Sequence, residues 1–258
     1  MKINTELFLD ILRKGTFNYS IDTIKIVFNS KKYSVRMRSN DGLVLLSGNN
    51  DIISGISETD EIEMNFSDVL RSVKTYFSLI TPDENGEVDI IISDEKITLV
   101  SDKEKADIYF CVPAIVDSYS NSDPGTKGVI TYESKIDDGF MDNFMDIYSS
   151  IKKVGSSFGK IYLTIEDGMF YIECTDKTNP ASNGIKVLIG NSEYNGNITV
   201  CFSFKSINNM IELIKQNYLD FVFSMDYIEE NKACKISMIC DIDHVEKYFI
   251  LNMIENIA

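Results

Sequence analysis

Apolar residues in the first half of the chain recur at two spacings, which predict helices and strands in a fixed order. Between residues 5 and 14, Leu7, Ile11 and Leu12 recur at helical spacing. Strand-like runs are predicted at 23–28, 33–38, 43–48, 61–66, 87–93, 96–101 and 106–112. A second helix is predicted at 67–80, because Ser67 suits an N-cap and an apolar face follows it. That face is formed by Val69, Leu70, Val73, Tyr76 and Phe77.

The second half of the chain repeats this order. Helices are predicted at 140–153 and 205–216, and a hairpin at 160–174 turns at Asp167-Gly168. Further strands are predicted at 128–134, 184–190, 197–204, 218–225, 233–241 and 245–254. Ile161 follows Ile24, and Phe170 follows Tyr33, by the same offset of 137 residues (161 − 24 and 170 − 33). Phe204 follows Phe66 by 138 residues, and a near-constant offset across several elements predicts one β-rich α+β fold that is used twice.

A polar segment, DSYSNSDPGTKG at 117–128, separates the two halves. Its Ser, Asn, Asp, Pro and Gly residues favour turns and contribute nothing to a core. We therefore predict a domain at 1–116, a linker at 117–128 and a second domain at 129–258.

The composition is strongly acidic, with 25 Lys and Arg against 40 Asp and Glu and a net charge of −15. This total argues against a protein that binds nucleic acid over its whole surface. No run of 18 apolar residues occurs, and the N-terminus does not read as a signal peptide, so we expect a cytoplasmic protein without a membrane partner. The five cysteines then stay reduced, and with one histidine and no CxxC spacing we expect no metal site.

Placement of the cations changes this picture. The predicted helices carry Lys and Arg at their ends or on the face opposite the apolar stripe. These residues are Arg13, Lys14, Arg71, Lys74, Lys152, Lys153, Lys205 and Lys215. The helix dipole explains the cations at helix C-termini equally well, but it explains the mid-helix Arg71 and Lys74 less well. A set of helices that presents cations to phosphates is the functional interpretation.

The candidate enzyme motifs in the sequence do not have the residues or the spacing that catalysis requires. GSSFGKI at 155–161 is one residue too short between its glycines for a P-loop, and Ile161 stands where Ser or Thr would bind magnesium. His244 lies in a predicted strand without a nucleophile arrangement, so a structural histidine is expected. Carboxylate pairs such as Asp241 and Asp243 are expected by chance at this composition. We predict no catalytic site, no cofactor and no enzymatic activity.

Three features of the chain resemble the sliding clamps of DNA polymerases, which include proliferating cell nuclear antigen and the clamps of T-even-type phages. They are the doubled helix and strand plan, the mid-chain linker, and the closing segment DHVEKYFILNMIE at 243–255. The opening MKINTELFLDILRKG is closer to the phage type. The closing segment departs from the cellular pattern, because Glu246 is an extra residue before Lys247 and Asn252 stands where cellular clamps tend to have Ala-Pro.

The resemblance implies the DNA-clamp fold, with two similar domains that each pack two helices on antiparallel β-sheets. Subunits would join head to tail into a ring, with the eight helix cations facing duplex DNA. The joining strands would lie at 106–112 and 184–190, with contacts through Ile108, Tyr109, Phe110, Cys111, Lys186, Val187, Leu188 and Ile189. A pocket for partner peptides would use Met37, Leu45, Ile115, Val116, Tyr119, Leu251 and Met253. Alternatively, these residues are ordinary core positions and edge strands of a monomer.

The resemblance implies a homotrimeric processivity factor for a cellular, viral or phage replication system. Its partners would be duplex DNA of any sequence, a DNA polymerase and an ATP-dependent clamp loader, and a role in late transcription stays open. Two alternatives remain. One is a monomeric clamp-like accessory subunit that holds DNA by charge, and the other is a protein scaffold without a DNA role.

Overall fold

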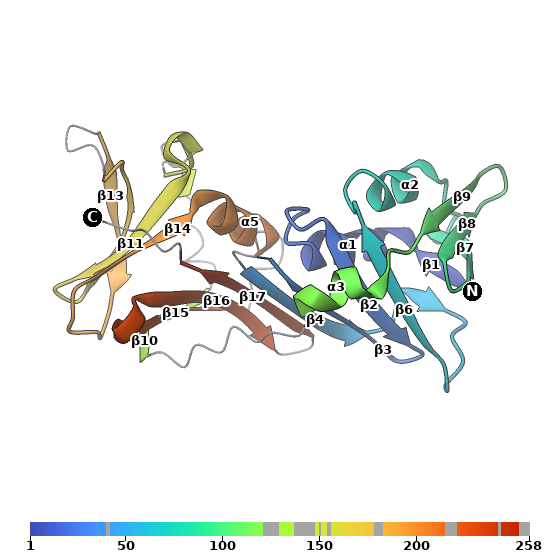
Figure 1. Ribbon diagram of the computed structural model, residues 1–258, viewed down its shortest axis with the longest axis horizontal. Helices are drawn as coiled ribbons and strands as arrows, with labels where there is room; N and C mark the ends of the chain where they lie inside the picture. The colour runs from blue at the N-terminus through green and yellow to red at the C-terminus, as the bar shows by residue number, and fades with distance from the viewer. Residues whose placement is uncertain are drawn as a thin grey trace. The chain divides into compact units, whose positions relative to one another are not determined.

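The computed structural model describes residues 1–39, 42–120, 129–136, 148–149, 151–153, 156–177, 183–214, 221–241 and 244–252. The chain divides into two compact units (Figure 1). The first unit comprises residues 1–39, 43–123 and 241–246, and the second comprises 40–42, 124–240 and 247–258. Each unit combines helices with antiparallel sheets, as the sequence predicts.

The first unit contains three helices and nine strands in its described part. The helices are α1 (Thr5–Gly15), α2 (Val73–Leu79) and α3 (Pro113–Ser120). The strands are β1 (Lys2–Asn4), β2 (Thr23–Asn29), β3 (Lys32–Arg38), β4 (Gly42–Asn49), β5 (Ile53–Ser54), β6 (Glu61–Ser67), β7 (Glu87–Ile92), β8 (Lys96–Val100) and β9 (Lys105–Tyr109). The strands that this unit contributes lie in the orders β4-β3-β2-β6 and β5-β1-β7-β8-β9.

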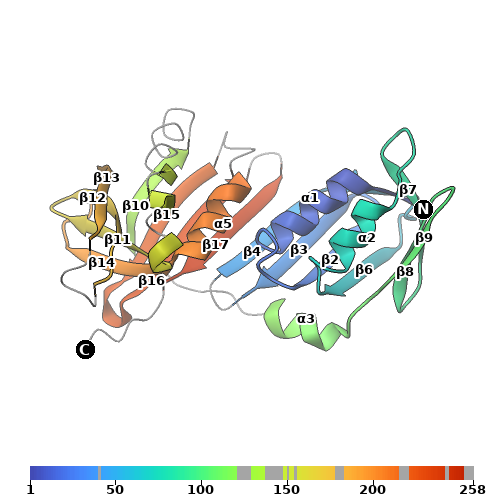
Figure 2. The same ribbon diagram turned by 90° about the horizontal axis from the view of Figure 1, so that it is seen from above.

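Helices α1 and α2 lie next to each other over the β4-β3-β2-β6 sheet (Figure 2). The side chain of Asn4 begins α1 by accepting a hydrogen bond from the backbone N–H of Leu7 at 3.0 Å. Phe8 of α1 packs against Phe77 of α2, with ring centroids 4.5 Å apart, and against Phe66 of β6. These buried aromatic rings fix the two helices on the sheet, so the opposite helix faces turn away from the core.

The second unit repeats this arrangement with β10 (Val129–Ile136), β11 (Lys160–Glu166), β12 (Met169–Cys174), β13 (Ile185–Asn191), β14 (Ile198–Ser203), α5 (Phe204–Ile214), β15 (Phe221–Ile228), the 3₁₀ turn η1 (Glu229–Asn231), β16 (Ala233–Asp241) and β17 (Val245–Leu251). Its sheets have the orders β13-β12-β11-β14 and β10-β15-β16-β17. The first order matches β4-β3-β2-β6 strand for strand, so the duplication is confirmed. The predicted hairpin turns at Asp167 (φ 50°) and Gly168 (φ 74°), both in the left-handed region of a type I′ turn.

The second predicted helix begins later than expected. Ser67 ends β6 and is not an N-cap, and Asp68 has a φ of 52°, so the chain turns before α2 starts at Val73. Leu70 and Tyr76, predicted on the apolar face, are exposed, as is Leu7 on α1. The predicted start of this helix was wrong because the turn at 68–72 interrupts the helical spacing between Val69 and Val73.

The predicted linker begins inside α3, so residues 117–120 are helical and not a turn-rich strap. Pro113 suits the first position of a helix, and Val116 is fully buried. The carboxylate of Asp117 accepts a hydrogen bond from the ammonium of Lys25 on β2 at 3.0 Å, which attaches α3 to the sheet. Residues 121–128, and the predicted helical residues 140–147 and 215–216, lie outside the described residues.

Candidate nucleic-acid interface

The cations of α1 lie in its last turn, where the helix dipole favours positive charge. The guanidinium of Arg13 is 2.9 Å from Asp10 Oδ1, one turn earlier on the same helix. Arg13 is half-buried in the last turn of α1. Arg13 therefore stays a predicted phosphate contact.

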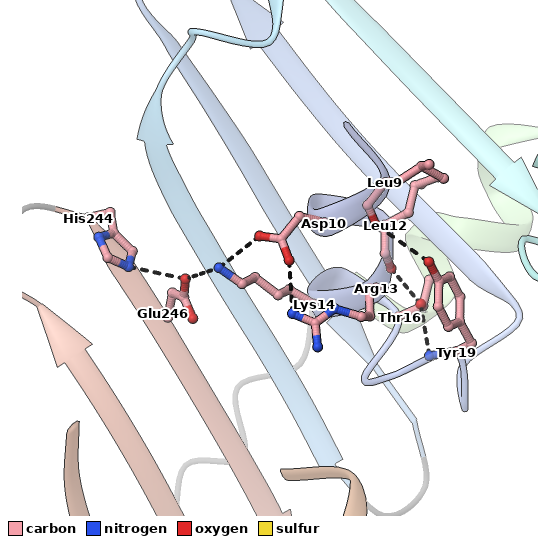
Figure 3. Close-up of polar contacts among 9 residues, drawn as sticks. All are labelled: Leu9, Asp10, Leu12, Arg13, Lys14, Thr16, Tyr19, His244 and Glu246. Carbon is pink, nitrogen blue, oxygen red and sulfur yellow. Dashed lines mark hydrogen bonds and ion pairs between the residues drawn. The ribbon is translucent and has the colours of Figure 1, made fainter. Parts of the chain in front are cut away.

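Lys14 is the centre of a chain of charged side chains that runs from Asp10 to His244 (Figure 3). Its ammonium is 2.6 Å from Glu246 Oε1 and 2.9 Å from Asp10 Oδ2, and its side chain is 11% exposed. Glu246 is buried as well, with a side chain 3% exposed, and it accepts from His244 Nε2 at 3.1 Å. Burial alone would lower the pKa of Lys14, but Glu246 and Asp10 outweigh it and raise the pKa.

These contacts correct the prediction that Lys14 faces DNA. A buried ammonium held by two carboxylates has little capacity to meet a phosphate, because leaving Glu246 unpaired would strand a buried charge. His244 is the structural histidine that the sequence indicated, but it lies just before β17 and not within it.

The predicted cations near α2 lie on accessible surface. Arg71 is exposed in the turn before α2, and Lys74 is half-buried in its first turn. The ammonium of Lys74 lies 4.5 Å from the centroid of the Tyr19 ring, a cation–π contact that the sequence does not reveal. Neither Arg71 nor Lys74 forms an ion pair with the residues that the structure describes.

The second unit carries its cations on two neighbouring helical segments. Lys152, in the helical residues 151–153, is 3.1 Å from Glu212 on α5, and the Tyr148 hydroxyl donates to the side chain of Asn208 on α5. Lys153 and Lys205 are exposed. Glu212 therefore neutralises part of this surface, while Lys153 and Lys205 stay accessible. Lys215 lies outside the described residues.

The two strands predicted to join subunits are both edge strands. In the described part of each sheet, β9 pairs with β8 alone and β13 pairs with β12 alone. Tyr109 on β9 is 65% exposed and Leu188 on β13 is 47% exposed, whereas Ile108 is buried. The strand ends at Tyr109, because the backbone N–H groups of Phe110 and Cys111 bond to Glu95 and Asn65. Lys186, Val187 and Ile189 lie on β13, where Lys186 is 2.5 Å from Glu166.

The residues predicted to form a peptide pocket differ in their exposure and lie in both units. The prediction for Met37 is wrong, because its side chain is fully buried. Met37 lies on the same side of β3 as Val35. That side faces α1, because Val35 Cγ1 would lie 3.0 Å from a Cβ added to Gly15. Leu45 pairs with Arg36 on the opposite side of the sheet and is half-buried. Ile115 is exposed and Val116 buried, both on α3, and Leu251 ends β17 in the second unit. The side chains of Tyr119 and Met253 lie outside the described residues.

Within the described ranges, no helix is long and apolar enough to cross a bilayer. The same residues contain no group of three or more His, Cys, Asp and Glu side chains that could hold a metal ion. The cysteines at 111, 174, 201, 234 and 240 are thiols that form no disulfide.

The fold of the chain matches solved structures over nearly its whole length. An A. fulgidus PCNA with the C-terminal region of FEN-1 bound matches with a TM-score of 0.62 and 13% identity, covering 99% of this chain and 98% of that one. A PCNA2–PCNA3 complex from Sulfolobus tokodaii matches with a TM-score of 0.60 and 15% identity, covering 99% and 100%. The DNA polymerase III subunit beta of Pseudomonas aeruginosa gives 0.63 and 12%, and this chain spans 66% of its length.

No protein-family model matches the sequence, and no curated protein matches it. At 12–15% identity the structural matches establish the fold and leave the function to be argued from the site. The doubled sheet order and these matches lead to one conclusion: the chain has the fold of the DNA polymerase sliding clamps.

Proposed function

We propose that this protein is a ring-forming sliding clamp, a processivity factor that encircles duplex DNA and tethers a DNA polymerase to its template. The observation that carries the proposal is the position of the accessible cations in a chain whose net charge is −15. Arg71, Lys153 and Lys205 are exposed on or beside the helices, in a fold shared with PCNA and the beta subunit. Contacts of this kind meet phosphates without reading bases, which suits movement along DNA.

The edge strands β9 and β13 support a head-to-tail ring. An uncovered edge strand invites pairing with another chain, and a closed head-to-tail ring would pair β9 of each subunit with β13 of the next. The chain spans the full length of the matched PCNA chains, which supports the trimer that the resemblance implies. The binding role, with no catalysis by this chain, belongs to the same proposal.

The partners follow from the same likeness. FEN-1 is bound to the matched A. fulgidus PCNA, which supports a peptide-binding role for this chain through the surface of Leu45 and Ile115. A DNA polymerase and an ATP-dependent clamp loader are the further proposed partners, at the site of replication. A phage or viral origin and a role in late transcription stay predictions.

A topological experiment tests the proposal. The protein is assembled at high concentration on a nicked circular plasmid, and bound protein is measured before and after the plasmid is linearised. A clamp stays on the circle and leaves the linear DNA through its ends. Equal retention on both forms would indicate binding by charge alone, and no retention on either form would favour a scaffold without a DNA role.

Two double variants test the cationic surface itself. Arg71→Glu with Lys74→Glu places two negative charges beside α2 and is expected to abolish retention on the circle. Lys31→Glu with Lys32→Glu makes the same change in charge at two exposed positions of the β2–β3 turn, away from the helices. This control is expected to retain the protein on the circle, so loss in both variants would count against a specific surface.

A further inference from the structure

The segment after α1 has an uncommon backbone conformation. Phe17, Asn18 and Tyr19 have φ values of 52°, 57° and 58°, three consecutive residues other than glycine in the left-handed region. Asparagine tolerates this region, but phenylalanine and tyrosine enter it at a cost in free energy. Such a conformation persists where the surroundings enforce it, and it concentrates at functional segments. We call residues 16–20 the left-handed turn.

Buried hydrogen bonds hold the left-handed turn in place (Figure 3). Thr16 is fully buried, and its hydroxyl donates to the carbonyl of Leu12 at 2.5 Å and accepts from the backbone N–H of Tyr19 at 3.2 Å. The N–H of Asn18 donates to the carbonyl of Arg13 at 2.7 Å, and Phe17 anchors the turn in the core. The turn is therefore fixed to the end of α1, and it determines the direction in which Tyr19 projects.

The side chain of Tyr19 contacts α2 through its ring and the backbone of α1 through its hydroxyl. Lys74 of α2 places its ammonium 4.5 Å from the ring centroid. Burial raises the pKa of Tyr19; the positive charge of Arg13 on α1 opposes that rise, and the negative charge of Asp10 adds to it. The Tyr19 hydroxyl lies 3.5 Å from the carbonyl of Leu9, at the limit of a hydrogen bond. The contact with Leu9 is therefore weak, and the hydroxyl stays suited to a stronger acceptor.

We propose that Arg13, Tyr19 and Lys74 form one composite binding site for a backbone phosphate of duplex DNA, with Tyr19 as its positioning residue. The inference rests on the proposed function and adds to it a residue that the sequence did not indicate. The ring restricts an otherwise flexible lysine before DNA arrives, which reduces the ordering cost of the contact. A phosphate at this site accepts hydrogen bonds from the ammonium and the guanidinium without reading a base.

Two substitutions at Tyr19 separate its ring from its backbone role. Tyr19→Phe keeps the ring below Lys74, and Tyr19→Asn removes the ring while suiting a φ of 58° better than tyrosine does. Affinity for a blunt duplex is measured by fluorescence anisotropy across a salt series between about 50 and 200 mM. We expect Tyr19→Phe to bind nearly as wild type does. We expect Tyr19→Asn to bind about two- to fivefold more weakly, which is the loss of one exposed cation–π contact.

The salt series and a spectrum of Lys74 distinguish positioning from a structural role. With Tyr19→Asn, the slope of log K against log salt is expected to fall in magnitude by about 0.9, the value for one lost phosphate contact. The Lys74 Cε proton resonances, shielded by the ring, are expected to shift toward random-coil values. If Tyr19→Asn lowers the melting temperature but leaves the slope unchanged, the role is structural and the inference is wrong.

The composite phosphate site and the sliding-clamp function would be refuted by different results. If wild type stays on circular DNA while Tyr19→Asn matches it in affinity and slope, the composite site is refuted and the clamp proposal stands. If wild type neither binds the short duplex nor stays on circular DNA, both proposals are refuted together.

Discussion

The buried pair of Lys14 and Glu246 leads to a sharp prediction about stability. Glu246→Gln keeps the shape of the side chain but removes the negative charge that lies 2.6 Å from the Lys14 ammonium. Both residues are buried in the first unit, and their sequence positions are 232 residues apart. The substitution therefore leaves a buried cation that retains Asp10, a residue on the same helix, as a charged partner.

The expected cost follows from this geometry. Removing one partner of a buried ion pair destabilises a protein by about 3–5 kcal/mol. Because Asp10 still neutralises Lys14 and the amide oxygen of Gln still accepts a hydrogen bond, we place the cost just below this range, at about 2–3 kcal/mol. For a chain of this size the melting temperature would fall by about 4–12 °C.

The assay is urea unfolding of the wild type and of two matched variants. Glu212→Gln makes the same chemical change in the more exposed pair with Lys152, at 3.1 Å, and is expected to cost less than about 1 kcal/mol. The double variant Lys14→Met with Glu246→Leu removes both buried charges and is expected to recover most of the stability. If Glu246→Gln costs no more than Glu212→Gln, the assignment of Lys14 to structure and not to DNA is refuted.

The remaining predictions concern the edge strands and the acid response of α1. Tyr109→Asp or Leu188→Asp, each at an exposed edge position, is expected to shift the oligomer to monomer in sedimentation experiments. The control Ile91→Asp, at a position 62% exposed on an interior strand, is expected to leave the oligomer intact. Dissociation by all three variants would show that the edge strands do not hold the oligomer together. Burial alone would raise the pKa of Asp10, but Arg13 and Lys14 outweigh it and lower the pKa. Asp10 therefore stabilises the fold above its unfolded pKa of about 3.9, and this contribution is lost as the pH falls through its lower folded pKa. Wild type and Asp10→Asn should therefore differ in stability at neutral pH and converge in strong acid. An equal difference at both pH values in urea titrations would show that charge is not the cause.

Most of the fold could be predicted from the sequence because local pattern and tertiary structure agree along the strands. Alternation located β2, β3 and β6, and Asp167-Gly168 located the β11–β12 turn, since that turn type requires residues that tolerate positive φ. The start of α2 was missed because Asp68 adopts a left-handed conformation that its residue type does not announce. Helix α3 was missed in part because its attachment through Lys25 is a tertiary contact.

The candidate site could be predicted in outline, because the charges on amphipathic helices are visible in the sequence. Their pairing could not, since the contact of Lys14 with Glu246 depends on how residues at opposite ends of the chain meet. Met37 was placed in the peptide pocket although neighbouring strand positions point to opposite faces, and the register puts Met37 on the helix side. Tyr19 gave no signal, because a left-handed turn of three consecutive residues has no sequence signature at Phe17 or Tyr19.

Electron microscopy of the purified full-length protein in negative stain tests the central claim most directly. The account predicts closed rings with a central hole, in which the cationic helix faces would surround DNA. Monomeric particles at micromolar concentration would contradict it, because a single copy leaves the outer edges of β9 and β13 without a neighbouring strand and cannot enclose DNA.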